Sequence, residues 1–198
     1  MIAGLLLASG ASRRFGSDKL VAPLDGRAVV RWSAEALLPA VDTVYVVVRA
    51  QADAIREALG GLHVQWVVNP NAHEGMASSI RAGVAALPRE AEAVVITLGD
   101  QPRIDSRVVR DVVARWRDAA PGTSAVVAEY DDGRGHPALF GAAHFGTLRA
   151  LEGDKGARDL LVSLGDAVSV VRVTGARPAD VDTPEALAAL ALGGRSAR

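Results

Sequence analysis

The sequence predicts an α/β protein with a mostly parallel sheet that helices cover on both faces. In the first half, short apolar runs alternate with longer segments of helical character, the order that produces parallel strands joined by helices. The apolar runs are nearly continuous, as expected for strands that are buried on both faces. A length of 198 residues with 49% apolar content suffices for one domain with a large core.

The first half divides into clear elements. The apolar residues 5–7 indicate the first strand, which is followed by a glycine-containing loop. A helix is expected at residues 29–38, where Pro39 ends it. The remaining strands of this half are expected at 43–48, 64–68 and 93–98, and the remaining helices at 52–59, 78–87 and 108–117.

The second half is less regular. A turn-rich segment, 131–135, separates two expected strands, and Pro184 suits the first position of the last helix. Strands are expected at 124–130, 138–140 and 168–173, and helices at 142–151, 157–164 and 183–192. The chain shows no repeat and no low-complexity linker, so we treat residues 1–198 as a single domain.

The composition argues against several classes of protein. Lys and Arg number 22 against 23 Asp and Glu, and this net charge of −1 disfavours nucleic-acid and membrane-surface binding. The absence of cysteine excludes thiol catalysis, disulfides and zinc–thiolate sites. No stretch approaches the roughly 20 apolar residues of a membrane span, and no positive charge precedes residues 5–7 as it would in a signal peptide. We therefore expect a cytoplasmic protein.

The loop after the first strand has the residues of a phosphate-binding loop. From Gly10 to Lys19 it follows the pattern Gly-x-Ser-x-Arg-x-Gly-x-x-Lys. Glycines allow backbone N–H groups to approach an anion closely, and Arg13, Arg14 and Lys19 add charge-assisted hydrogen bonds. The spacing fits neither a P-loop nor a dinucleotide fingerprint. We expect the loop to surround a triphosphate; the alternative is an exposed basic turn.

Other polar residues follow the ends of other predicted strands. Asn69 follows the third strand and Asp100 the fourth, and ligands of parallel sheets gather at the carboxyl ends of the strands. A nucleoside triphosphate arrives with Mg²⁺, which one or two carboxylates hold. Asp100 is therefore a candidate metal ligand, with a turn or helix cap as the alternative. The same alternative applies to Asp182, which precedes the last helix.

Residues 7–19 resemble the signature Leu-Ala-Ala-Gly-x-Ser-x-Arg-x-Gly-x-x-Lys of the nucleotidyltransferases related to the molybdenum-cofactor enzymes. Ser9 replaces the second alanine of that signature, and Phe15 replaces its usual methionine. Further matching segments lie at 75–83, 99–102, 135–137, 153–158 and 180–184, in family order. The resemblance implies a three-layer α/β/α Rossmann-like nucleotidyltransferase fold, with a nucleotide-binding half at about 1–120 and an acceptor-binding half at about 121–192.

The resemblance also implies a role for each matching residue. Arg14 and Lys19 would be catalytic, and Asp100 and Asp182 would hold Mg²⁺. His136, Asp154 and Arg158 would bind the acceptor, although His136 also suits a strand and Arg158 a solvated helix face. The residues that would bind the nucleotide are Leu7, Ala8, Ser9, Gly10, Ser12, Gly16, Asn69, Gly75, Ser79 and Asp100.

Within the family, the segments at 135–137 and 153–154 resemble molybdopterin cytidylyltransferase most. That enzyme transfers CMP from CTP to the molybdenum–molybdopterin monophosphate and releases pyrophosphate, and a hydroxylase-type molybdoenzyme receives the product. Three alternatives stay open: use of GTP, a sugar-phosphate acceptor, and a non-catalytic nucleotide sensor. The last has no need of Lys19, Asp100 and Asp182 together. A nicotinamide-dependent oxidoreductase lacks support because the Gly-x-Gly-x-x-Gly spacing is missing.

Overall fold

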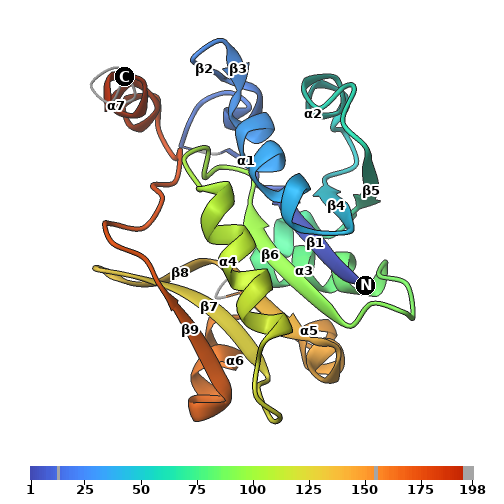
Figure 1. Cartoon of the computed structure of the whole chain (residues 1–198). Coiled ribbons are helices and arrows are strands. Elements are labelled where there is room, and N and C mark those ends of the chain that lie inside the picture. Colours follow the sequence, from blue (N-terminus) through green and yellow to red (C-terminus); the bar gives the residue numbers. More distant parts are fainter. Residues whose placement is uncertain (13, 154–155, 194–198) are drawn as a thin grey trace.

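The central sheet draws its strands from the whole chain. The computed structural model describes residues 1–12, 14–153 and 156–193. Within them, seven strands form one sheet in the order β5-β4-β1-β6-β8-β7-β9, and β2 and β3 form a separate hairpin (Figure 1). The strands are β1 (Ile2–Ala8), β2 (Pro23–Leu24), β3 (Arg27–Ala28), β4 (Thr43–Val48), β5 (Val64–Val68), β6 (Ala93–Leu98), β7 (Ala125–Tyr130), β8 (Gly133–Gly141) and β9 (Val168–Arg172).

The strands of the first half run parallel. β1 pairs with β4 on one side and with β6 on the other, so that Gly4 lies opposite both Val44 and Val95. Every residue of β1 is buried, which the continuous apolar run predicted. The carboxyl ends of β1, β4, β5 and β6 therefore meet along one side of the sheet, which we call the carboxyl edge.

Helices cover both faces of the sheet, which confirms the predicted three-layer α/β/α architecture. Because successive strand residues point to opposite faces, Leu6 packs with one set of helices and Leu5 with the other. The first set is α1 (Val29–Leu37), α2 (Asp53–Ala58) and α4 (Ser106–Arg117). The second set is α3 (Met76–Ala85), α5 (Phe145–Arg149) and α6 (Arg158–Ser163).

The second half differs from the prediction at two places. β8 runs antiparallel between β6 and β7 and begins at Gly133, where residues 138–140 were expected. The turn-forming residues 133–135 continue the strand because they pair with residues 128–130 of β7, beyond a register shift at which residues 136–137 of β8 have no partner in β7. The helix expected at 142–151 is a 3-10 turn, η4 (Ala142–His144), followed by the short α5.

The last segment returns the chain to the carboxyl edge. After β9, the amide of Val181 donates to the carbonyl oxygen of Asp100 at 2.8 Å, and the Val181 side chain is fully buried. Pro184 then starts α7 (Pro184–Gly193), as predicted, and the helix packs beside the β2–β3 hairpin (Figure 1). The remaining 3-10 turns are η1 (Lys19–Val21), η2 (Leu38–Ala40), η3 (Ala72–Glu74) and η5 (Gly165–Ala167). In the part of the chain that the structure describes, no helix is long and apolar enough to cross a membrane.

Candidate active site

The loop between β1 and η1 is shaped by its own polar side chains. The Ser12 hydroxyl accepts a hydrogen bond from the backbone amide of Lys19 at 3.2 Å, and the Asp18 carboxylate caps η1 by accepting from the amide of Leu20. Gly16 has a φ of +78°, a conformation that favours glycine. A Cβ atom on Gly10 or Gly16 would meet no atom within 4 Å. The backbone there is open to a ligand; Arg13 lies outside the described residues.

Four predicted residues, two of them from distant parts of the chain, meet at the end of this loop. The ammonium nitrogen of Lys19 donates to the carboxylate of Asp100 at 2.5 Å and to that of Asp182 at 2.9 Å. Arg14 donates to the second oxygen of Asp182 at 2.8 Å. Lys19 is only 8% exposed, whereas Arg14 extends into solvent. The two carboxylates therefore share one buried cation and one exposed cation.

The charges of this cluster depend on one another. Burial raises the pKa of the Asp100 carboxyl, although Lys19 opposes the shift. The pKa of Asp182 is lowered, mainly by the hydrogen bond from Lys19. Burial alone would lower the pKa of Lys19, but the two carboxylates outweigh it, so the pKa is raised. Lys19 is consequently charged throughout the neutral range.

The donor set fits a hard divalent cation. The Lys19 ammonium occupies a point on which two carboxylates converge, as they would on a metal ion. Among residues 1–12, 14–153 and 156–193, no group of three or more His, Cys, Asp or Glu side chains is placed to hold a metal. Mg²⁺ typically takes one or two protein carboxylates and completes its shell with water and phosphate oxygens. Asp100 and Asp182 would be those two ligands.

A buried polar cluster lies at the ends of β1 and β5. The hydroxyls of Ser9 and Ser79 are 2.6 Å apart, and the Asn69 amide donates to Ser78 at 2.8 Å and to Ser79 at 3.1 Å. All four side chains are at most 6% exposed. Gly75, with a φ of +94°, precedes the first residue of α3. The structure thus brings the predicted Ser9, Asn69 and Ser79 together, with their side chains largely bonded to one another.

The predicted acceptor residues are less closely grouped. β8 pairs with β6 so that Ala138 lies opposite Ile96, which carries His136 to the carboxyl edge. Withdrawal from water lowers the pKa of the His136 imidazole to about 4, even though the charge of Asp100 acts in the opposite direction. Arg158 is exposed at the start of α6. Asp154 lies outside the described residues.

The sequence analysis missed the contacts of two residues, Gln101 and Arg49. The Gln101 amide donates to Asp180 at 2.8 Å, which ties the returning segment to the end of β6. Arg49 follows β4 and bonds both Gly10 and Asp18 of the loop. The one signal for Arg49 was a lone arginine directly after a buried apolar strand, at the edge where ligands gather.

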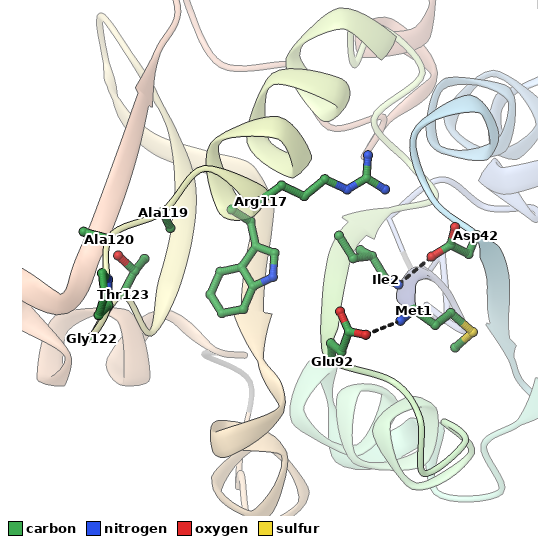
Figure 2. A pocket seen from close by; sticks show the side chains of 11 residues that line it. Met1, Ile2, Asp42, Glu92, Arg117, Ala119, Ala120, Gly122 and Thr123 are labelled. Atoms are coloured by element: carbon green, nitrogen blue, oxygen red, sulfur yellow. Dashed lines mark hydrogen bonds and ion pairs between the residues drawn. The ribbon is translucent and has the colours of Figure 1, made fainter.

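A pocket of the described structure lies away from these residues. Figure 2 shows this pocket of about 500 Å³, next to the first residues of β1 and the end of α4. Two of the carboxylates that line it already have partners, since Glu92 binds the Met1 amino group at 2.9 Å and Asp42 accepts from the Ile2 amide at 2.7 Å. None of the predicted site residues is among those that line it.

Comparison with known proteins identifies the family. Residues 4–168 match the model of the MobA-like NTP transferase domain. By its fold and its loop the protein is a nucleotidyltransferase. The chain belongs to the MobA-like NTP transferase family.

Individual relatives match most of the chain. It is 32% identical over 193 residues to the purine catabolism protein PucB of Bacillus subtilis, with 92% of each protein covered. It is 36% identical over 137 residues to a molybdenum cofactor guanylyltransferase of Cereibacter sphaeroides, with 68% of this chain and 65% of that protein covered.

Solved structures agree over nearly the whole length. The crystal structure of Rv0371c from Mycobacterium tuberculosis has a TM-score of 0.85 at 32% identity, covering 96% of this chain and 97% of that one. Its complex with manganese has a TM-score of 0.82 at 30% identity and covers 96% and 98%.

Proposed function

We propose that the protein transfers CMP from CTP to the molybdenum–molybdopterin monophosphate in a Mg²⁺-dependent reaction. The observation that carries the proposal is the convergence of Asp100 and Asp182 on the ammonium of Lys19, next to a loop with open backbone at Gly10 and Gly16. The manganese bound by the similar Rv0371c supports a divalent ion for this family. Mg²⁺ held by the two carboxylates would neutralise charge on the nucleotide phosphates.

The reaction asks little covalent chemistry of the protein. A phosphate oxygen of the acceptor attacks the α-phosphorus, and the bond to the bridging oxygen of the β-phosphate breaks, so that pyrophosphate leaves with the electron pair. The acceptor phosphate is already a nucleophile at neutral pH and needs no general base. Lys19 and Arg14 would stabilise charge on the leaving pyrophosphate, and the loop would align the α-phosphate.

The nucleobase would lie over the ends of β1 and β5. There the backbone of residues 7–10, Gly75, Ser79 and nearby Asn69 would contact the base and ribose, with Ser12 and Gly16 on the phosphates. Because the Ser9 and Ser79 hydroxyls bond to each other, the backbone carries most of the hydrogen bonding left for the base. GTP is the second candidate, supported by the Cereibacter sphaeroides relative named as a guanylyltransferase.

The acceptor would bind on the half at about 121–192, whereas the half at about 1–120 binds the nucleotide. His136 is at the carboxyl edge, and its low pKa keeps the imidazole neutral at pH 7, so that it offers a hydrogen bond rather than a positive charge. Asp154 and Arg158 would also contact the phosphorylated pterin. A hydroxylase-type molybdoenzyme would receive the product.

The test is pyrophosphate release from CTP, GTP, ATP and UTP with Mg²⁺ and the pterin acceptor. We expect release with CTP, and loss of it in Lys19→Ala, because one preorganised charge contact contributes about 3–4 kcal/mol to the transition state. A thermal-shift panel with the same nucleotides reports binding independently. Release with GTP alone would refute the cytidylyl assignment, and no shift with any nucleotide would refute the site.

A further inference from the structure

Arg49 connects the two ends of the loop between β1 and η1. It follows β4, whose Val48 lies opposite Ala8 in the sheet. One of its terminal nitrogens donates to the carbonyl oxygen of Gly10 at 3.1 Å, and the other donates to the carboxylate of Asp18 at 2.5 Å. Its third donor bonds the carbonyl oxygen of Gln51 at 3.2 Å. Each nitrogen of the guanidinium therefore has a partner in the protein.

The two loop residues that Arg49 bonds, Gly10 and Asp18, lie at the two ends of the loop. Gly10 is where the chain leaves the buried strand, and Asp18 is the cap that starts η1. Lys19, the first residue of η1, is the cation between the two carboxylates. A contact that fixes Asp18 therefore also fixes the position from which Lys19 reaches the site.

The other contacts that hold the described part of the loop lie toward its end, where Arg14 and Lys19 bond the two carboxylates of the site and Phe15 packs against a buried apolar cluster. The internal backbone bond of the loop runs from the Phe15 amide to the Ser12 carbonyl at 3.0 Å, and Ser12 also receives the Lys19 amide. Gly10 and Gly16 lie against open space. A loop that is already fixed when its ligand arrives loses less conformational entropy on binding. A planar guanidinium can bridge a carbonyl and a carboxylate at once, whereas a lysine ammonium is a single point charge.

We propose that Arg49 is a positioning residue of the nucleotide site, which closes the phosphate loop through Gly10 and Asp18 and thereby sets Lys19. This role rests on the proposed function, but it assigns Arg49 no contact with the nucleotide. The charge of Arg49 is directed at Asp18, and all three of its nitrogens donate to groups of the protein. Loss of Arg49 acts on the nucleotide only through the shape of the loop.

The first experiment needs no nucleotide. Trypsin cleaves after arginine, so cleavage after Arg14, mapped by mass spectrometry, reports how often the loop opens. We expect Arg49→Ala to raise the rate of this cleavage about tenfold, the effect of losing charge-assisted hydrogen bonds. The rate of cleavage in Arg49→Lys should lie between those of the wild type and of Arg49→Ala. A rate equal to that of the wild type in Arg49→Ala overturns the proposal.

Arg31 offers a matched control. It likewise bonds one carboxylate, Glu35, and two carbonyl oxygens, those of Ala58 and Gly60, but it connects α1 to the end of α2. Its side chain is 28% exposed, against 32% for Arg49. Arg31→Ala should leave cleavage after Arg14 and nucleotide affinity unchanged. Circular dichroism of each variant verifies that it is folded.

The second experiment measures the dissociation constant of the nucleotide by calorimetry. We expect Arg49→Ala and Asp18→Asn to weaken binding by a similar factor of about ten, and the double variant to be no weaker than either, because both remove one interaction. Weaker binding in Arg49→Ala with unchanged binding in Asp18→Asn would overturn the proposal, since Arg49 would then contact phosphate directly. If the wild type binds no nucleotide, the proposed function fails, whereas the cleavage rates still decide whether Arg49 closes the loop.

Discussion

Replacing Lys19 by methionine should reveal how strongly the two carboxylates depend on it. Methionine keeps most of the apolar stem and removes only the ammonium that bonds Asp100 and Asp182. Arg14 remains on Asp182, but its side chain is 72% exposed, so it replaces little of the lost interaction. The variant therefore leaves Asp100 without its cationic partner.

The expected magnitude follows from the exposure of the groups. Removing one partner of a fully buried ion pair costs about 3–5 kcal/mol, because the other charge is left desolvated. The Asp100 side chain is 21% exposed and the Asp182 side chain 37%, so water screens part of the interaction. We expect the free energy of unfolding to fall by about 2 kcal/mol at pH 7.

The pKa shifts of Asp100 and Asp182 determine how the loss of stability in Lys19→Met changes with pH. Burial already raises the pKa of Asp100, and the loss of Lys19 removes the charge that opposes this shift, so the pKa rises further. In the unfolded chain Asp100 has a pKa near 3.9. As the pH rises from this value to the higher pKa of Asp100 in the folded variant, the variant loses stability, because ionising the buried carboxyl costs free energy only in the folded protein. Asp182 acts in the same direction. Its lowered pKa means that Lys19 stabilises the folded wild type while Asp182 is ionised, and this stabilisation is lost as the pH falls through the pKa of Asp182 in the folded protein.

Urea unfolding at pH 7 and pH 4 measures both quantities. The difference between wild type and Lys19→Met should be largest at pH 7 and should shrink at pH 4. The control Arg107→Met removes one positive charge from the exposed pair with Asp105, and it should change stability little at either pH. Equal stability of Lys19→Met and wild type at pH 7, or a difference that grows toward acid, would refute this reasoning.

Three further perturbations test other parts of the structure. Gly83→Ala should destabilise the protein by about 2 kcal/mol, measured by urea unfolding, because the new methyl group would clash with the fully buried side chain of Leu5; an unchanged midpoint would show that the two can separate freely. Ser79→Ala should cost about 1–2 kcal/mol in the same assay, since the buried Ser9 hydroxyl loses its partner, and a neutral result would mean that another group replaces it. The imidazole of His136 should titrate near pH 4 in an NMR experiment, because its surroundings desolvate the charged form although the residue is only partly buried. A midpoint between 6 and 7 would contradict this desolvation.

Most of the first half could be predicted because its strands are continuous apolar runs bounded by turn-forming residues. The β2–β3 hairpin was missed, although Asp25 and Gly26 at its turn both have positive φ and form a known hairpin signal. Its strands have only two residues each, too few for any periodicity to appear. β8 was predicted too short because residues 133–135 are turn-forming types, and only pairing with β7 holds them extended.

The candidate site shows a similar division. The glycines, the lysine and the carboxylates could be assigned to the site from their residue types and from their positions after predicted strands. That Lys19 touches both Asp100 and Asp182 could not be predicted, because it depends on where the segment after β9 returns to the sheet. That path is fixed by the Val181 amide on the Asp100 carbonyl and by the buried Val181 side chain, neither of which leaves a pattern in the sequence.

The return of the last segment has a consequence for how the protein can vary. Asp100 and Asp182 belong to one cluster, yet α4, the strands β7 to β9 and the helices α5 and α6 all lie between them in the chain. The two carboxylates are positioned by contacts at the carboxyl edge, through Gln101, Asp180 and Val181, and not by the length of what intervenes. Loops in this interval can therefore lengthen or change composition at small entropic cost, altering what binds beside the pair while the pair itself stays in place.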